Sequence, residues 1–392
     1  NHTDLTANIW VNPGETAGNG IDDDNNGYID DINGYDVSDL DNNPMPPNNT
    51  FAHGTHCAGI VGARTDNNIG ISAIGFNIKI IAVKATMSTG NQSAIDAGYG
   101  GIVYAVNAKA RVISCSWGGT GSSTTEQSVI NYAWANNSMV VAAAGNDNNN
   151  VLHYPGAYTN VYCVASTTTG DVRSGFSCYG TWVDIAAPGS NIYSTVPTNN
   201  YTNMSGTSMA TPMVAGLCGL VIAYKPYMTM SQVISCINSS STNINSQNPS
   251  YIGQLGAGRI DASGALICAN GLAPAPPTVN FIAAPTVTCP GSQVKFYDKS
   301  FVGLTSWAWT FQGGTPSTST LQNATVTYAA AGTYSVQLIG TNPNGNATKV
   351  KTSYITVAGP IALPLTEGFT AATYPPAGWS EYDALLDSMK WY

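Results

Sequence analysis

Short apolar runs alternate with longer helix-like segments through roughly the first 270 residues. The runs at 79–84, 112–115 and 139–144 have the length and apolar content of buried strands. The segments 97–107 and 209–223 are longer, rich in Ala and Gly, and almost free of charge, as in helices. Continuous apolar strands are typical of parallel sheets covered on both faces. The pattern therefore predicts an α/β domain in which helices cover both faces of a parallel sheet.

The pattern changes after a Pro-rich segment, and apolar residues then alternate with polar ones. Val294 and Phe296 show this period of two, and so do Trp307 and Trp309. Alternation predicts strands with one buried face, so we expect the tryptophans to pack in a core, in an Ig-like β-sandwich. The predicted division is an α/β domain at 1–271, a linker at 272–277, a β-sandwich at 278–358 and the truncated start of a further β-sandwich module at 359–392.

Composition narrows the possible partners. Charged residues make up 9% of the 392 residues, the net charge is −9, and Arg64 is the first basic residue of the chain. An acidic chain of this kind is a poor ligand for nucleic acid. No apolar run approaches the 18 residues that would suggest a membrane-spanning helix.

Eight cysteines indicate an oxidising environment, as outside the cell. Their spacing alone allows many pairings. We expect Cys163 to pair with Cys178 and Cys236 with Cys268.

Three short segments of small residues carry a His, an Asn and a Ser in that order. They read His-Gly-Thr-His-Cys-Ala-Gly from His53, Ala-Ala-Gly-Asn ending at Asn146, and Gly-Thr-Ser-Met-Ala-Thr-Pro around Ser208. These segments resemble the histidine, oxyanion-hole and serine motifs of the subtilisin-like serine proteases. The resemblance covers roughly residues 1 to 270 and implies the subtilisin-like fold and serine endopeptidase activity.

The chemistry supports these roles. A serine hydroxyl needs a neighbouring base, and the resemblance assigns that role to His53 and a structural role to His56. Ser208 falls at the start of a helix-like segment, where free backbone N–H groups and the helix dipole favour a developing negative charge. Asn146 would donate an N–H to the same oxyanion. By the resemblance, Cys57 stays a free, buried thiol.

The acid that completes such a triad precedes the His in this family. Asn1 to Leu5 resembles the segment that follows the catalytic Asp in these proteases, and Asp4 itself matches a calcium ligand there. We therefore expect the catalytic Asp upstream of Asn1, with this sequence an excerpt that lacks it and is nearly inactive alone.

The resemblance also implies which residues bind the substrate. Ser116, Trp117 and Gly118 match the strand that pairs with an extended peptide. The resemblance also implies a roomy, mostly apolar pocket that favours large uncharged side chains. Its walls and base would be formed by Gly118, Ala144, Gly145 and His153, although a surface position is the alternative for His153.

Eight aspartates crowd between residues 22 and 41 with no basic residue near them in sequence. Oxygen-bearing residues at alternate positions followed by Gly27 repeat the first half of a calcium-binding loop, but Asn33 stands where that loop has its last Glu. We expect structural Ca²⁺ here, and no organic cofactor; a bare acidic loop is the alternative. The expected ligands are Asp22, Asp24, Asn26, Tyr28, Asp30 and Asp31.

The resemblance suggests a second, incomplete calcium site, formed by Asp4 and the loop after the first helix. Its expected ligands are Asp4, Asn67, Ile69 and Ile71.

Two functions are compatible with these features. The first is a secreted serine endopeptidase acting on polypeptides, whose sandwich resembles a PKD domain and contacts extracellular protein or polysaccharide. The second is a non-catalytic adhesion or binding protein on a degenerate protease scaffold.

Overall fold

The computed structural model describes residues 2–272, 276–300 and 304–359. These residues form two units, one made of Asn1–Asn280 with the short segments Lys299–Trp307 and Ile339–Thr348, the other of the rest of the C-terminal strands. Most of the module expected at 359–392 lies outside the described residues.

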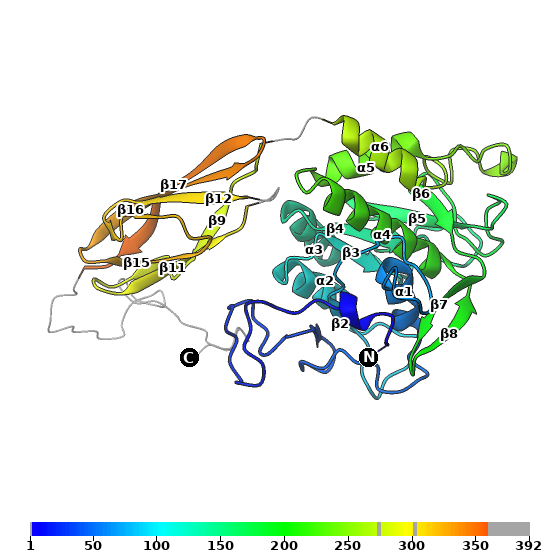
Figure 1. The fold of residues 1–392 in the computed structure, drawn as a ribbon, viewed down its shortest axis with the longest axis horizontal. Coiled ribbons are helices and arrows are strands. Elements are labelled where there is room, and N and C mark those ends of the chain that lie inside the picture. The colour runs from blue at the N-terminus through cyan, green and yellow to red at the C-terminus, as the bar shows by residue number, and fades with distance from the viewer. Residues whose placement is uncertain (1, 273–275, 301–303, 360–392) are drawn as a thin grey trace, which may run out of the picture. The chain divides into compact units, whose positions relative to one another are not determined.

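A four-stranded parallel sheet forms the centre of the first unit (Figure 1). Its register places Ile113 opposite Val140 and Val164 opposite Ile185. The predicted parallel sheet is confirmed. In their order across the sheet the strands are β3 (Val112–Cys115), β4 (Met139–Ala143), β5 (Val161–Thr167) and β6 (Ile185–Pro188).

Helices cover both faces of this sheet, and alternate residues of β4 show why. Met139 and Val141 pack into one apolar cluster, whereas Val140 and Ala142 pack into another on the opposite face. Side chains alternate between faces along a strand, so an all-apolar strand requires cover on both sides. On the first face lie α4 (Thr207–Tyr224), α5 (Met230–Ser240) and α6 (Ala262–Gly271), and on the second α2 (Gly98–Asn107) and α3 (Thr124–Ala135).

Helix α4 is the most deeply buried of these helices. It carries no charged residue, and 67% of it is buried inside the domain. Its length and hydropathy would also suit a membrane-spanning helix, but here they fit a core helix beneath a sheet. Pro212 is the sixth residue of α4 and therefore lies inside the helix. It has no N–H to donate to the Ser208 carbonyl four residues earlier. That carbonyl instead accepts the side chains of Ser116 and Cys57.

A separate two-stranded sheet contacts α2. Strand β1 (Gly34–Asp36) pairs in parallel with β2 (Ala82–Lys84). The strand expected at 79–84 is therefore shorter than predicted, although Ile80 still forms an isolated bridge with Ile9.

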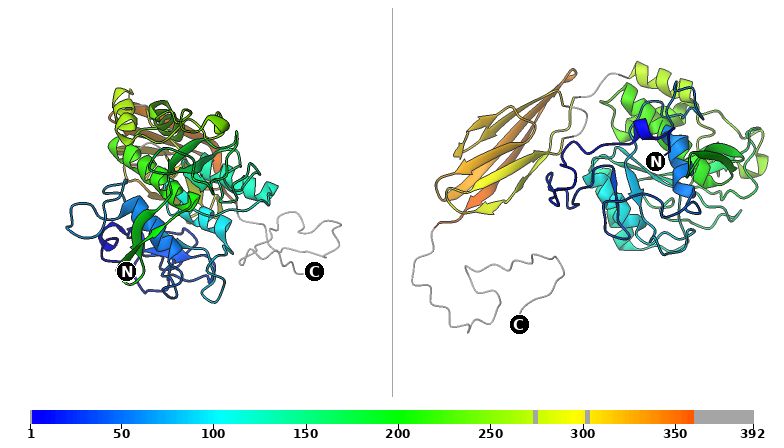
Figure 2. Two further views of the ribbon diagram at one scale, coloured as in Figure 1. Left: turned by 90° about the vertical axis from the view of Figure 1, so that its right-hand side faces the viewer. Right: turned by 60° about the horizontal axis from the view of Figure 1, so that its bottom comes forward.

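Helix α1 (His53–Gly62) packs against α4 on one side and against the hairpin of β7 (Ile192–Val196) and β8 (Asn200–Met204) on another (Figure 2). A Cβ at Gly216 of α4 would lie 3.1 Å from the Val61 carbonyl oxygen. Two short 3-10 helices, Thr6–Asn8 and Pro249–Tyr251, complete the domain.

The C-terminal strands form two sheets, as the alternating pattern predicts. Phe281, Phe296, Trp309 and Phe311 are buried and contact one another through their rings. Trp309 packs in the core as expected, whereas Trp307 is only half-buried. One sheet has the order β10 (Val287–Thr288), β17 (Gly345–Val357), β16 (Gly332–Asn342), β12 (Ser306–Phe311) and β14 (Thr318–Ser319), and the other β13 (Gly314–Thr315), β15 (Ala324–Tyr328), β11 (Gln293–Asp298) and β9 (Phe281–Ala284).

One of the two expected disulfides is present. Cys236 and Cys268 are joined and link α5 to α6. The pairing of Cys163 with Cys178 is wrong, because both are free, buried thiols. The sulfur of Cys178 is instead engaged by the loop after β4, where it accepts a hydrogen bond from the Asp147 N–H at 3.4 Å.

The Cys236–Cys268 disulfide closes a loop with a sequence separation of 32. Cys236→Ser should therefore lower the free energy of unfolding by about 2–4 kcal/mol, because the unfolded chain regains the freedom that the link removes. The exposed, free Cys289 provides the control, and Cys289→Ser should leave the unfolding midpoint unchanged in denaturant titration. Equal midpoints for the two variants would show that the link adds no stability.

Candidate active site

The start of α4 is held by the ends of two sheet strands. Ser208, the second residue of α4, donates a hydrogen bond from Oγ to the Ser116 carbonyl at 3.1 Å. The Ser116 hydroxyl in turn donates to the Ser208 carbonyl at 2.9 Å. Ser116 directly follows β3, so the reciprocal pair fixes Ser208 at the carboxyl end of the sheet.

His53 lies at the first position of α1. One turn further along this helix, the Cys57 thiol donates a hydrogen bond to the Ser208 carbonyl at 3.4 Å. Residues four apart share a helix face, so His53 lies on the side of α1 that faces the start of α4. The structure thus brings the first and third motifs together through Cys57.

The environment of His53 favours its neutral form. Desolvation of the ring by the surrounding protein lowers its pKa, and the nearby His56 lowers it further. A neutral imidazole can accept a proton near pH 7. His56 is buried and bonds through Nε2 to the Thr202 carbonyl at 3.1 Å, as expected of a structural helix histidine.

Cys57 is a free thiol, as expected, but its residue is half-buried rather than buried. Burial raises the pKa of Cys57 to about 11. The thiol therefore stays protonated near neutral pH and does not compete with Ser208 as a nucleophile.

Asn146 lies three residues after the end of β4 and contacts the N-terminal end of α4. Its Oδ1 accepts hydrogen bonds from both the N–H and the hydroxyl of Thr207, each at 2.9 Å. Its Nδ2 has no hydrogen-bond partner in the described part of the chain, and lies 3.6 Å from where a Cβ at Gly206 would stand. Thr207 is the positioning residue that sequence reasoning missed. Its place beside Ser208 in the serine motif was the available signal.

The segment expected to bind substrate is also fixed in place. Gly119 and Tyr154 exchange two backbone hydrogen bonds, at 2.9 and 2.7 Å. Gly118 packs so closely that a Cβ there would lie 2.7 Å from the Tyr154 carbonyl. Trp117 makes an edge contact with Tyr99 at 5.3 Å between ring centroids.

The other predicted pocket residues adjoin Asn146. Ala144 is buried, and the Gly145 N–H donates to the Thr207 hydroxyl at 3.3 Å. His153 is buried rather than at the surface, and its ring packs on Gly145, where a Cβ would lie 2.7 Å from His153 Cδ2. Gly145 has φ +102°, a conformation that favours glycine.

The acidic loop gathers a carboxylate cluster that differs from the expected ligand set. Oxygens of Asp22, Asp24 and Glu15 all lie within 4.8 Å of one another. Desolvation raises the pKa of Glu15, and the charge of Asp24 contributes in the same direction. Glu15 was missed by sequence reasoning because it precedes the loop pattern by seven residues.

Of the remaining expected ligands, Asn26 bonds to the cluster, where its N–H donates to Asp22 Oδ1 at 3.1 Å and to Asp24 Oδ1 at 3.0 Å. Asp30 accepts hydrogen bonds from the backbone of Gly18 at 2.7 Å and of Gly20 at 3.0 Å. Asp31 is buried and accepts the Tyr104 hydroxyl at 2.8 Å. The Tyr28 N–H and the side chains of Asn26 and Asp31 tie the loop to itself through hydrogen bonds.

The residues expected to form the second calcium site lie close together and are hydrogen-bonded to one another. The buried Asp4 carboxylate accepts hydrogen bonds from the Asn67 amide at 2.7 Å and from the Ile71 N–H at 3.0 Å. Asn67 Oδ1 in turn accepts the Ile69 N–H at 3.1 Å. Tyr201 adds a third donor to Asp4, at 3.2 Å.

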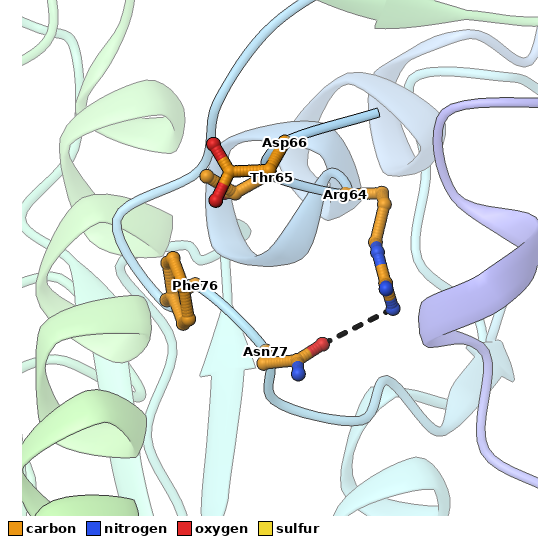
Figure 3. A pocket seen from close by; sticks show the side chains of 5 residues that line it. All are labelled: Arg64, Thr65, Asp66, Phe76 and Asn77. Atoms are coloured by element: carbon orange, nitrogen blue, oxygen red, sulfur yellow. Dashed lines mark hydrogen bonds between the residues drawn. The ribbon is translucent and has the colours of Figure 1, made fainter. Parts of the chain in front are cut away.

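A small pocket lies in the loop after the C-terminal end of α1 (Figure 3). Arg64 donates to Asn77 Oδ1 at 3.2 Å across it, and Thr65, Asp66 and Phe76 complete the lining. Helix α1 has ten residues, so this pocket is about 15 Å along the helix from His53. It therefore lies apart from His53.

Comparisons with known proteins agree with this geometry. The sequence profile of the Subtilase family matches residues 1–258, and that of the PKD domain matches residues 274–357. The chain therefore belongs to the subtilase family, and its first domain is that of a serine-type endopeptidase.

Individual similar proteins support the assignment to the serine proteases. Thermitase from Thermoactinomyces vulgaris is 48% identical over 190 residues, which are 48% of this chain and 67% of thermitase. A thermophilic serine proteinase from Bacillus sp. strain AK1 is 45% identical over 190 residues, 48% of this chain and 46% of that protein. A solved protease structure from Pseudoalteromonas arctica is 34% identical with a TM-score of 0.50, covering 55% of this chain and 70% of that one.

The electrostatics of His53 can be measured directly. In this chain its imidazole should titrate below 6.5, because desolvation disfavours the charged form. Folding then favours the neutral ring, so this contribution to stability is complete above pH 6.5 and is lost as the pH falls through the lower folded value. An NMR titration, assigned by the signal that disappears in His53→Asn, measures it. A midpoint at or above 6.5 would contradict the prediction.

Proposed function

We propose that the chain is part of a serine endopeptidase that cleaves peptide bonds through an acyl-enzyme. The observation that carries this proposal is the convergence of Ser208, His53 and Asn146 at the start of α4. His53 takes the Ser208 proton as Oγ attacks the scissile carbonyl, and then passes it to the leaving amine. A water molecule, activated by the same imidazole, hydrolyses the ester.

The oxyanion is stabilised from two directions. Asn146 Nδ2 is one donor, and the Ser208 backbone N–H, in the first turn of α4, is the other. Thr207 holds Oδ1 of Asn146, which leaves the amide nitrogen for the oxyanion. Donors of this kind generally contribute about 10²–10³ in kcat.

The third member of the triad is proposed to be an aspartate on a strand upstream of Asn1. No carboxylate is among the groups that shift the pKa of His53 in the described part of the chain. Strands β2 and β3 also belong to separate sheets, each hydrogen-bonded to a strand on one side. An added strand between them would join the two sheets and could present an acid near His53.

The substrate proposed is an extended polypeptide that pairs with residues 116–118. Gly118, Ala144 and Gly145 would wall the pocket for the residue before the scissile bond, with His153 at its base. We also propose secretion, supported by the Cys236–Cys268 disulfide, which suits an oxidising compartment. The PKD domain would contact extracellular protein or polysaccharide.

A fluorophosphonate probe tests the catalytic proposal on a chain that includes the preceding residues. Wild type should be labelled covalently, and Ser208→Ala should abolish labelling because the nucleophile is removed. Ser205→Ala is the matched control, since Ser205 is an exposed serine three residues away, and it should be labelled like wild type. Absence of labelling in folded wild type would support the non-catalytic adhesion protein instead.

We propose that the acidic loop holds structural Ca²⁺. Its clustered donors are all carboxylate oxygens, the ligands that Ca²⁺ prefers, and three acids this close repel one another without a cation. Asp22, Asp24 and Glu15 would hold the ion, while Asp30 and Asp31 shape the loop. The second site, at Asp4 and Asn67, would require the Asn67 amide to turn its oxygen toward the ion.

Removing calcium should therefore lower the melting temperature, because the cluster regains its repulsion. Glu15→Gln should weaken the calcium response by removing one ligand, whereas Asp23→Asn changes the same charge in the same loop outside the cluster. Differential scanning calorimetry with and without a chelator compares them. A melting temperature unmoved by the chelator, or an equal loss in Asp23→Asn, would refute the assignment.

A further inference from the structure

A second cluster of potential ligands lies just beyond the oxyanion-hole residue. Asp147 and His153 belong to the loop after β4, and Cys178 belongs to the turn that precedes β6. One ligand atom from each lies within 4.8 Å of the other two. We propose that these three residues bind a single Zn²⁺ or a similar borderline-soft divalent ion.

The donor set selects the class of ion. Thiolate, imidazole and carboxylate are the ligands of zinc, whereas Ca²⁺ and Mg²⁺ favour oxygen alone. His153 Nε2 is 2.8 Å from Asp147 Oδ2. Tetrahedral bonds of about 2.0–2.3 Å place ligand atoms about 3.3–3.7 Å apart. The pair therefore needs to open by only about half an ångström to admit the ion.

Hydrogen bonds already orient two of the ligands. His153 Nδ1 lies 3.2 Å from the Val151 carbonyl, an acceptor that places the proton on Nδ1. Nε2 lies at hydrogen-bond distance from Asp147 Oδ2, and the metal would take the place of the proton between them, which gives the usual arrangement of a metal-binding histidine. The Asp147 N–H donates to Cys178 Sγ at 3.4 Å, which holds the sulfur beside the Asp147 loop.

The backbone around the cluster is fixed without a metal. The Cys178 N–H donates to the Gly145 carbonyl at 2.9 Å, and the Asn148 N–H donates to the Phe176 carbonyl at 2.8 Å. These bonds tie the two ligand-bearing loops together. Metal binding would therefore cost little conformational entropy, because both loops are already ordered.

The proposed metal site is accessible to solvent on one side. His153 and Cys178 are buried, but the Asp147 side chain is 61% exposed. An ion can enter past Asp147, and a water molecule can fill the fourth position of a three-ligand zinc site. Because Asp147 directly follows Asn146, a bound ion would also restrain the loop that carries the oxyanion donor.

Co²⁺ is the probe for this site, because its bond to a thiolate gives a charge-transfer absorption. It is titrated into the reduced 392-residue chain in excess Ca²⁺, which occupies the oxygen-only sites. One equivalent should produce the band, and one equivalent of Zn²⁺ should remove it. Cys178→Ser should abolish the band, whereas Cys163→Ser, which replaces a second buried free thiol, should retain it.

Absence of the band in wild type, or its persistence in Cys178→Ser, would overturn the proposal. Since Cys178 is buried and its replacement can impair folding, Asp147→Asn is the second variant at an exposed position. It should keep the metal-free melting temperature and bind Co²⁺ at least tenfold more weakly; unchanged affinity would also overturn the proposal. These measurements do not depend on proteolysis, so their outcome is independent of whether the proposed function is correct.

Discussion

The burial of an uncharged helix beneath a parallel sheet is the constraint on which the site depends. Helix α4 packs on β3, β4, β5 and β6, so its position follows from the sheet. Its first turn emerges where the parallel strands end, the edge at which sheets of this type carry functional groups. Ser116 and Asn146, which follow β3 and β4, then bond to the residues at that turn. Core packing thus determines where Ser208 lies.

Local patterns in the sequence were sufficient to predict the parallel sheet and to locate the three motifs. The run at 112–115 became β3 with unchanged bounds, because an apolar strand buried on both faces has little freedom to shift its register. Val294 and Phe296 were found in the core for a similar reason, since a period of two assigns one face of a strand to the interior. In both cases the element's own residues carry the information.

The features that sequence reasoning missed depend on the direction of side chains in loops. Cys178 was expected to meet Cys163, but its sulfur points toward the Asp147 N–H in a neighbouring loop. Glu15 lies beside Asp22 and Asp24 because its chain segment folds back over the acidic loop, where its Oε1 accepts the N–H groups of Asp23 and Asp24. No periodicity in the sequence encodes such long-range placements.

A chain with few charges must neutralise them locally, which explains the contrast between its acidic regions. Asp36 and Asp39 share the nearly buried Lys84, and these contacts lower the pKa of Asp39. Glu15 and the aspartates beside it have no basic partner among the ion pairs of the described residues. Hydrogen bonds from the backbone stabilise Glu15 in part, and the proposed cation would balance the remaining charge. With few Lys and Arg residues to supply counter-charges, the metal ions proposed for these loops would take that role.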